Sequence, residues 1–375
     1  MPPRPVLVAL VVLLALAAGT AAPRARAARL TAEQARLLAA AEQGLAKEQQ
    51  LWWDARYGWY DEYRFSVYSS PLLMLWGAYQ VFNTVNGIAL ADPTPENVAR
   101  VRAFANGAEA YWNPAVPPTG AYAYYPHFHP TRIRYYFDDN GWFALAFLDS
   151  YRITHDSRYL RDALRAYRFL ALAGWDRRRG GFWWTTYHEH KTSEPLAAAI
   201  VAGAKLYRIT GDRRYLDDAT RWLAWANAHS WNGDRSLYQR NATDPTVMSY
   251  VEGLMAEGNE LLCKAAGTRA DCARAERVAT ASIAAFGRDL HWSPIGDSVY
   301  LYGLLNLYAL DRNTAWYSLA LRNAERALAT QDANGLYLTG WDGSAQGDDT
   351  RLADLGLNSA TLSVFAWVAA VPAPS

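Results

Sequence analysis

The stretch YRITHDSRYLRDA at residues 151–163 recurs 56 residues later as YRITGDRRYLDDA at residues 207–219. In each copy an apolar stripe with helical spacing ends near the Thr, and a second helical stripe begins with Tyr159 or Tyr215. Asp156 and Asp212 stand at the break, where a helix N-cap side chain accepts otherwise free backbone N–H groups. Since self-similarity at a fixed period is typical of repeat architectures, the stretch predicts a repeated helical hairpin.

Extending this pattern along the chain predicts twelve helices in six antiparallel hairpins. The expected ranges are 31–52, 71–86, 95–112, 139–154, 157–173, 193–209, 213–228, 246–265, 270–286, 297–310, 315–330 and 354–370. Without sustained period-two alternation, strands are expected to be short at most. The fold class is therefore all-α, an (α/α)6 barrel. A linear solenoid is the alternative, but solenoid repeats stay similar from end to end and these fade away from the middle.

The predicted connections differ in length and so distinguish the two ends of the barrel. Short connections are expected at 154–156, 210–212, 266–269 and 311–314, and long ones at 53–70, 113–138, 174–192, 229–245 and 331–353. Every long connection leads into an even-numbered helix, so the N-termini of these helices share one face. Long loops carry function more often than short ones, and we therefore expect the functional site on that face.

The N-terminus resembles an export signal. Arg4 precedes a short apolar run from Val6 to Ala18, and Ala25-Arg26-Ala27 matches a cleavage site. We expect a signal peptide at 1–27, a single catalytic domain at 28–375, and a secreted monomer that does not associate with membranes after cleavage. Lys+Arg number 37 and Asp+Glu 36, a balance that argues against a nucleic-acid partner.

Export bears on the two cysteines, Cys263 and Cys272, because an oxidising compartment permits disulfides. The 56-residue offset takes Tyr207 and Leu216 to these positions, so the pair replaces a contact across a helical hairpin. We favour a structural disulfide over a reactive thiol. Neither a metal nor a cofactor is expected, because His188 and His190 lack a matching carboxylate cluster.

Aromatic residues make up 14% of the chain, and many of the tryptophans fall in the long loops. Rings around a cleft would suit the apolar faces of sugars, although they could equally pack the loops onto the barrel. Asp138-Asp139 begins the fourth predicted helix, where acidic residues often serve only as caps. Side chains of neighbouring helical residues can nevertheless place two carboxyl groups roughly 5 Å apart, which suits retaining glycoside hydrolysis.

The stretch Asp138-Asp139-Asn140-Gly141-Trp142 and the following helix resemble glycoside hydrolase family 76, the endo-α-1,6-mannanases. The resemblance continues through Gly180-Gly181-Phe182-Trp183-Trp184, Lys191 and residues 206–212. It implies an (α/α)6 barrel and a metal-free double displacement with Asp138 as nucleophile and Asp139 as acid/base. The expected function is a secreted retaining hydrolase of α-1,6-mannosidic linkages in mannan or a related α-linked wall polysaccharide.

The long loops and helix starts on the same face supply candidate substrate-binding residues, some of which depart from the family pattern. We assign binding to Tyr136, Trp183, Trp184, Lys191, Tyr250, Glu252 and Trp341. The departures are Val251 and Glu252 in place of Asn and Gln, Thr185 in place of Asn, and Thr192–Pro195 in place of an Asn-rich run. Glu252 could be a third carboxylate in the cleft or a helix-surface residue. The alternatives to hydrolysis are a transglycosylase, a non-catalytic carbohydrate-binding protein and a sugar epimerase.

Overall fold

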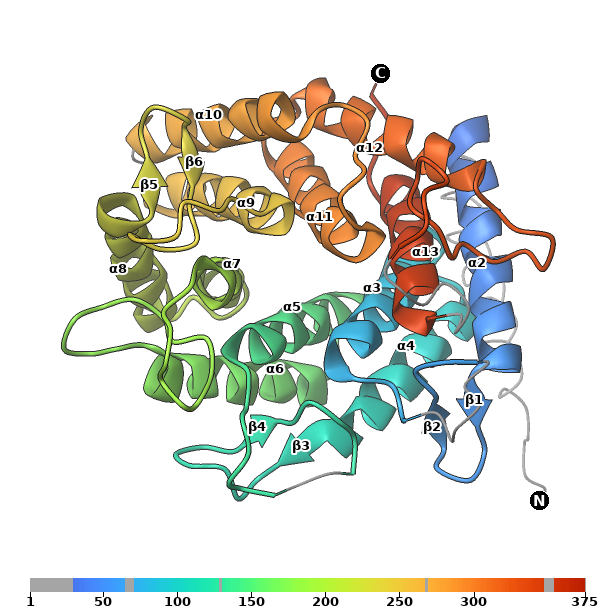
Figure 1. Ribbon diagram of the computed structural model, residues 1–375, viewed down its shortest axis with the longest axis horizontal. Coiled ribbons are helices and arrows are strands. Elements are labelled where there is room, and N and C mark those ends of the chain that lie inside the picture. Colours follow the sequence, from blue (N-terminus) through green and yellow to red (C-terminus); the bar gives the residue numbers. More distant parts are fainter. Residues whose placement is uncertain (1–29, 65–70, 128–129, 267–268, 347–353, 375) are drawn as a thin grey trace, which may run out of the picture.

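The computed structural model describes residues 30–374 except 65–70, 128–129, 267–268 and 347–353. The expected signal peptide therefore lies outside the described residues. Twelve α-helices are present in the described ranges, and they alternate between an outer and an inner layer (Figure 1). All twelve predicted helices are found, with ends that differ from the predicted ends by a few residues at most of the boundaries.

The outer helices are α2 (Ala32–Leu51), α4 (Pro95–Gly107), α6 (Ser157–Phe169), α8 (Arg213–His229), α10 (Arg269–Phe286) and α12 (Thr314–Leu328). The inner helices are α3 (Leu75–Ala91), α5 (Phe137–Thr154), α7 (Ser193–Thr210), α9 (Ser249–Ala266), α11 (Pro294–Asp311) and α13 (Leu355–Ala370). Each inner helix packs against the next, and α13 returns to α3, which closes the ring. The predicted (α/α)6 barrel is therefore confirmed, and the solenoid alternative is wrong.

Inner and outer helices differ in how much of their surface is buried. In α13 every residue is buried, and in α3 only Trp76 keeps intermediate exposure. The outer helices bury one face only, as the polar residues between their apolar positions require. A helix surrounded on all sides must be apolar or have its polar groups paired, which explains why α3 and α13 contain no charged residue.

Short segments complete the connections. A 3-10 turn (Ala108–Tyr111) follows α4, and a π-helical turn (Leu170–Gly174) follows α6. Three two-residue hairpins, β1–β2 (Trp53–Asp54, Trp59–Tyr60), β3–β4 (Trp112–Asn113, Ala121–Tyr122) and β5–β6 (Trp231–Asn232, Leu237–Tyr238), lie in the long loops. In each hairpin a Trp faces a Tyr across the strands. These loops all enter the N-termini of inner helices, as the alternation of loop lengths predicted.

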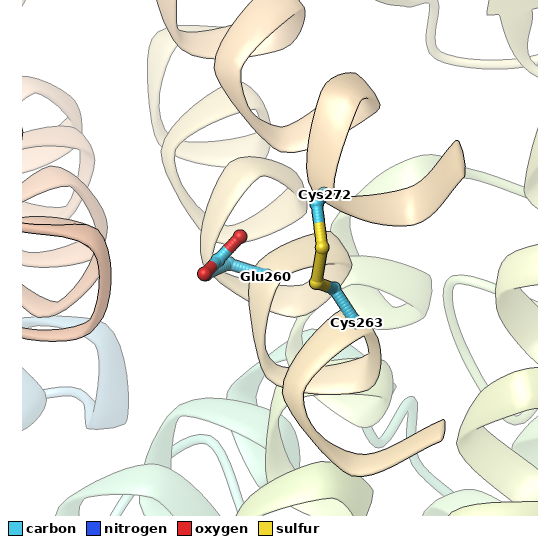
Figure 2. Close-up of side chains that lie close together, drawn as sticks. All are labelled: Glu260, Cys263 and Cys272. Atoms are coloured by element: carbon cyan, nitrogen blue, oxygen red, sulfur yellow. A yellow bond between two sulfur atoms is a disulfide. The ribbon is translucent and has the colours of Figure 1, made fainter. Parts of the chain in front are cut away.

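Cys263 and Cys272 form a disulfide, as predicted, and it joins α9 to α10 near their connection (Figure 2). Glu260 lies close to both sulfur atoms, so the three side chains have the proximity of a metal site. The two sulfurs are bonded to each other, however, and the Glu260 carboxylate pairs with Lys264 at 3.2 Å. The cluster is therefore a structural crosslink. None of the helices in the described ranges is long and apolar enough to span a bilayer.

Glycines allow α9 and α11 to pack backbone against backbone. A Cβ atom on Gly303 would lie 2.5 Å from the carbonyl carbon of Gly253. A Cβ atom on Gly253 would lie 2.6 Å from the backbone carbonyl oxygen of Tyr300. Gly258 likewise approaches Ile200 on α7. Glycines on α9 therefore allow both neighbouring inner helices to approach closely.

Replacing Gly303→Ala should lower the free energy of unfolding by about 1–3 kcal/mol, because two backbones would have to separate. Urea denaturation of the purified protein measures this loss. The matched control is Gly233→Ala, because a Cβ there would meet only the Trp231 Nε1 atom at 3.7 Å. Equal urea midpoints for Gly303→Ala and wild type would contradict the close backbone packing of α9 against α11.

Candidate active site

The second residue of each inner helix lies at the loop end of the barrel. In chain order these residues are Trp76, Asp138, Glu194, Tyr250, Ile295 and Gly356. The rings of Trp76 and Tyr250 are 6.2 Å apart across the mouth. The charge of Glu194 acts on both Asp138 and Tyr250, so these side chains share one site. The 56-residue repeat relates Asp138 to Glu194 and Glu194 to Tyr250.

Asp138 and Asp139 lie in the first turn of α5, which begins two residues before the predicted start. Trp184 donates its indole Nε1–H to Asp138 Oδ2 at 2.8 Å, and the backbone N–H of Asp139 donates to Asp138 Oδ1 at 3.0 Å. Both hydrogen bonds favour the charged form of the Asp138 carboxyl. Burial nevertheless raises the pKa of Asp138 above its usual range, and the charge of Glu194 raises it further.

Asp139 is the more protected carboxyl of the pair, with 8% of its surface exposed. Burial raises the pKa of Asp139 well above its usual range, and the charge of Asp138 adds to the rise. A helix N-terminus favours carboxylates, but here desolvation outweighs that effect. Since Asp138 receives the hydrogen bonds that stabilise a charge, a single proton shared by the pair belongs on Asp139. One carboxylate and one carboxylic acid therefore stand side by side.

Glu194 adds a third carboxyl group to the mouth. It is 1% exposed, and Arg240 donates from Nε at 3.0 Å and from Nη2 at 2.7 Å to its Oε1 atom. The Arg240 guanidinium also lies 5.8 Å from the centre of the Trp184 ring. Arg240 thus neutralises Glu194 and packs against the indole that binds Asp138, so the three groups form one connected network around the carboxyl pair.

Aromatic rings form the opposite side of the mouth. The centre of the Tyr250 ring lies 5.9 Å from the centre of the Trp142 ring. It lies 5.8 Å from the centre of the Trp292 ring, on which it stacks in parallel. Trp292 is 55% exposed, which makes it the most exposed of the large hydrophobic side chains in the described residues. A flat, open ring at this position can support the apolar face of a sugar.

Two more predicted residues lie beside Asp138: Tyr136, which directly precedes α5, and Trp184, in the loop before α7. Tyr136 pairs with Thr185 in a β-bridge, and the backbone N–H of Phe137 donates to the Trp184 carbonyl at 2.9 Å. The rings of Tyr136 and Trp184 are 5.4 Å apart. Both side chains retain intermediate exposure, so they can line a binding groove.

Trp183 and Lys191 lie on the other side of the same loop. Lys191 Nζ donates to Asp176 Oδ2 and to the carbonyl of Gly180, both at 2.6 Å, and lies 4.7 Å from the centre of the Trp183 ring. The ammonium group of Lys191 is thus engaged in holding the loop. Trp183 stacks against His188 and lines a cavity of about 1020 Å³ that opens beside the loop.

The fourth residue of several inner helices fixes the preceding loop. These residues are Asn140, Glu252, Asp297 and Asn358, and they accept hydrogen bonds from the backbone N–H groups of Tyr122, Tyr238, Trp292 with Ser293, and Tyr337. In each of the four helices, one side-chain oxygen therefore ties a loop to the helix that the loop enters.

Two further predicted substrate-binding residues, Glu252 and Trp341, are buried and do not face the groove. Glu252 is fully buried, and its Oε1 accepts the Tyr238 N–H at 2.8 Å, so both alternatives considered for it are wrong. Its burial raises the pKa of Glu252 well above the usual range. Trp341 is 3% exposed and donates from Nε1 to Thr361 Oγ1 on α13, so it packs its loop onto the barrel.

Sequence reasoning missed Glu194, Arg240 and Trp292 as parts of the mouth. The repeat offset contained the signal for Glu194, because it relates this residue to Asp138. Arg240 and Trp292 carry no comparable signal, since each reaches the mouth from a loop whose path depends on the packing of two hairpins.

The chain is a closed barrel of six helical hairpins with paired carboxyl groups among aromatic rings at one mouth. The sequence model of "Glycosyl hydrolase family 76" matches residues 118–300. The predicted family resemblance is therefore confirmed, and it covers the segment that holds the carboxyl pair, Glu194 and Tyr250. No curated protein sequence matches the chain.

Solved structures with the same fold include members of this family. A GH76 α-mannanase from Bacteroides thetaiotaomicron superposes with a TM-score of 0.79 at 21% identity, over 93% of this chain and 98% of that chain. An inactive α-1,6-mannanase variant from Salegentibacter, in complex with α-1,6-mannotriose, gives 0.71 at 15%, over 89% and 99%. A cellobiose 2-epimerase from Spirochaeta thermophila gives 0.64 at 15%, over 93% and 98%. At these identities the likeness establishes the fold alone.

The pKa of Glu252 is higher in the folded protein than in the unfolded chain. Deprotonation of Glu252 therefore lowers the free energy of unfolding as the pH rises. The stability that protonated Glu252 contributes is fully present below the pKa of this residue in the unfolded chain. It is lost as the pH rises towards the pKa of this residue in the folded protein. Glu252→Gln keeps the oxygen acceptor, so the variant should match wild type near pH 4 and become increasingly more stable than wild type towards pH 8.

Thermal unfolding at several pH values measures this difference. Glu252→Ala serves as the control that removes the acceptor, and it should be less stable than wild type throughout. Loss of stability in Glu252→Gln at pH 8 would contradict the structural role assigned to this residue.

Proposed function

We propose that this protein is a retaining glycoside hydrolase that cleaves α-1,6-mannosidic linkages in mannan or a related α-linked wall polysaccharide. The observation that carries the proposal is the carboxyl pair in the first turn of α5, where hydrogen bonds favour charge on Asp138 and burial favours a proton on Asp139. Retaining hydrolysis needs one carboxylate to attack and one carboxylic acid to protonate the leaving group. The pair supplies both forms at once.

The proposed reaction proceeds in two displacements. The Asp138 carboxylate forms a bond to C1 of a mannose unit while the bond from C1 to the departing O6 breaks, and Asp139 gives its proton to O6. A water molecule then attacks C1, transfers a proton to Asp139 and releases Asp138. The carboxyls return to their starting states, so neither step needs a metal or a redox partner.

The surrounding residues support specific roles in this scheme. Trp184 orients Asp138 through its indole N–H, and Arg240 compensates the charge of Glu194. Tyr250 and Trp292 offer ring faces on the opposite side of the mouth, and Tyr136 extends the groove beside Trp184. The polysaccharide is the proposed partner.

α-1,6-Mannan is favoured as substrate because of the family and one of its members. In the inactive Salegentibacter variant two consecutive aspartates are replaced by asparagine, and that protein binds α-1,6-mannotriose. Asp138 and Asp139 are likewise consecutive here. We also propose that the protein is exported and acts as a secreted monomer, since the N-terminus resembles a signal peptide and the Cys263–Cys272 disulfide suits an oxidising compartment.

Asp138→Asn and Asp139→Asn should each lower the rate of oligosaccharide release from linear α-1,6-mannan by at least ~10³-fold, because each removes one of the two groups that react. Product analysis by chromatography measures release, and circular dichroism confirms folding. Asp149→Asn, on the same helix but near the opposite end, is the control for a changed charge. If wild-type protein cleaves none of a panel of α-linked mannans, the proposed activity is wrong.

Trp184→Phe tests whether the Trp184 indole N–H stabilises the negative charge on Asp138. Loss of the N–H donor removes a hydrogen bond that stabilises the Asp138 carboxylate, so the pKa of Asp138 should rise. The acidic limb of the kcat/KM profile should then move to higher pH by about one unit, since a hydrogen bond to a charged group contributes roughly 1.5–3 kcal/mol. Trp183→Phe is the matched control, and identical acidic limbs for both variants would refute the assignment.

A further inference from the structure

A second recess opens beside the loop that carries Trp183 and Trp184. Its volume is about 1020 Å³, at the upper end of the roughly 300–1,000 Å³ typical of ligand pockets. Trp183 lines this recess, whereas the next residue, Trp184, donates to Asp138 in the mouth. The recess therefore begins on the far side of the loop that borders the carboxyl pair. We call it the lateral cavity.

One wall of the lateral cavity carries three consecutive arginines, Arg177, Arg178 and Arg179. All three side chains are exposed, and none forms an ion pair with an acidic residue in the described part of the chain. The acidic residues of the cavity are already compensated. Asp176 pairs with Lys191 at 2.6 Å, and Glu189 pairs with Arg134 at 2.9 Å. The cavity thus has an excess of positive charge in a chain whose net charge is only +1.

The turn that presents these arginines is held in place by several contacts. Asp176 Oδ1 accepts the backbone N–H groups of Arg178 and Arg179, and Trp225 donates from Nε1 to the Arg179 carbonyl at 3.2 Å. Gly180 adopts a positive φ of 69°, and a Cβ there would lie 2.3 Å from the Trp225 ring. The three arginines therefore line one recess from a turn whose backbone is fixed.

Other walls of the lateral cavity are aromatic. Trp175, Trp183 and Trp225 line it together with Leu172. Ring faces suit the apolar faces of sugars, and the planar guanidinium group binds phosphate or carboxylate oxygens through paired hydrogen bonds. A neutral glycan would not need three uncompensated arginines.

We propose that the lateral cavity binds a segment of the glycan that bears phosphate groups, while the neighbouring mouth cleaves the chain. This inference rests on the proposed hydrolase function and adds a preference for anionic substrates. The binding would be electrostatic in large part, so it should weaken as ionic strength rises.

The triple variant Arg177→Gln, Arg178→Gln, Arg179→Gln tests the inference. The substrates are a phosphorylated α-1,6-mannan and the same polymer after chemical removal of its phosphate. The variant should lose on the order of tenfold in kcat/KM on the phosphorylated polymer, because an exposed charge contributes only a modest attraction in water. On the polymer without phosphate, kcat/KM should change less than about twofold. For wild type, added NaCl should lower kcat/KM on the phosphorylated polymer selectively.

A charge-matched control removes three exposed arginines from outer helices, Arg161→Gln, Arg213→Gln and Arg277→Gln, and should leave the preference for phosphorylated polymer intact. If the triple variant Arg177→Gln, Arg178→Gln, Arg179→Gln loses kcat/KM equally on both polymers, or loses none on either, the inference is overturned. Binding of inorganic phosphate as tight as that of phosphorylated mannan would also overturn it, because the cavity would then recognise the free ion.

Binding separates this inference from the proposed function. With Asp138→Asn as the background, titration calorimetry compares the two polymers in the absence of turnover. Tighter binding of the phosphorylated polymer that disappears in the arginine variant supports the lateral cavity even if wild-type protein hydrolyses neither polymer. Equal binding of the two polymers overturns the inference even if hydrolysis is observed.

Discussion

The ring of inner helices is closed and buried, so the loops at its mouth must be fastened to it from within. Single side-chain oxygens at the fourth position of α5, α9, α11 and α13 do this by accepting loop backbone N–H groups. On α5 that residue is Asn140, one position after the carboxyl pair. The contact that anchors the β3–β4 loop therefore also orients the first turn in which Asp138 and Asp139 lie.

Periodicity made much of this arrangement predictable. The 56-residue repeat gave the hairpins, their order and the shared face of the long loops, and the cysteine pair followed from the same offset. The position of Asp138 and Asp139 at the start of an inner helix was also predictable, but the helix pattern alone was compatible with simple caps, and the family resemblance singled them out as a pair. Glu252 and Trp341 were misplaced because their burial depends on tertiary packing: a polar side chain at a helix start and a loop tryptophan look alike in sequence whether they face solvent or the barrel.

The charges at the mouth depend on tertiary contacts, so they could not be predicted from the sequence. Three carboxyl groups converge from two neighbouring helices, and desolvation would strongly disfavour three charges there. Arg240 compensates Glu194, while Trp184 and a backbone N–H support charge on Asp138, which leaves Asp139 as the group that keeps a proton. Arg240 approaches from a loop after α8, and no local pattern in its sequence marks it as a partner of a residue 46 positions earlier.

The Cys263–Cys272 bond has a consequence for the integrity of the chain. It spans the connection between α9 and α10 and lies near the C-terminal end of α9, whereas the carboxyl pair lies in the first turn of α5. If a protease hydrolysed a peptide bond between these two residues, the fragments would stay covalently joined. Each fragment would still contribute inner helices to the same ring. The crosslink thus protects the molecule from dissociation after a single peptide-bond cleavage at this connection.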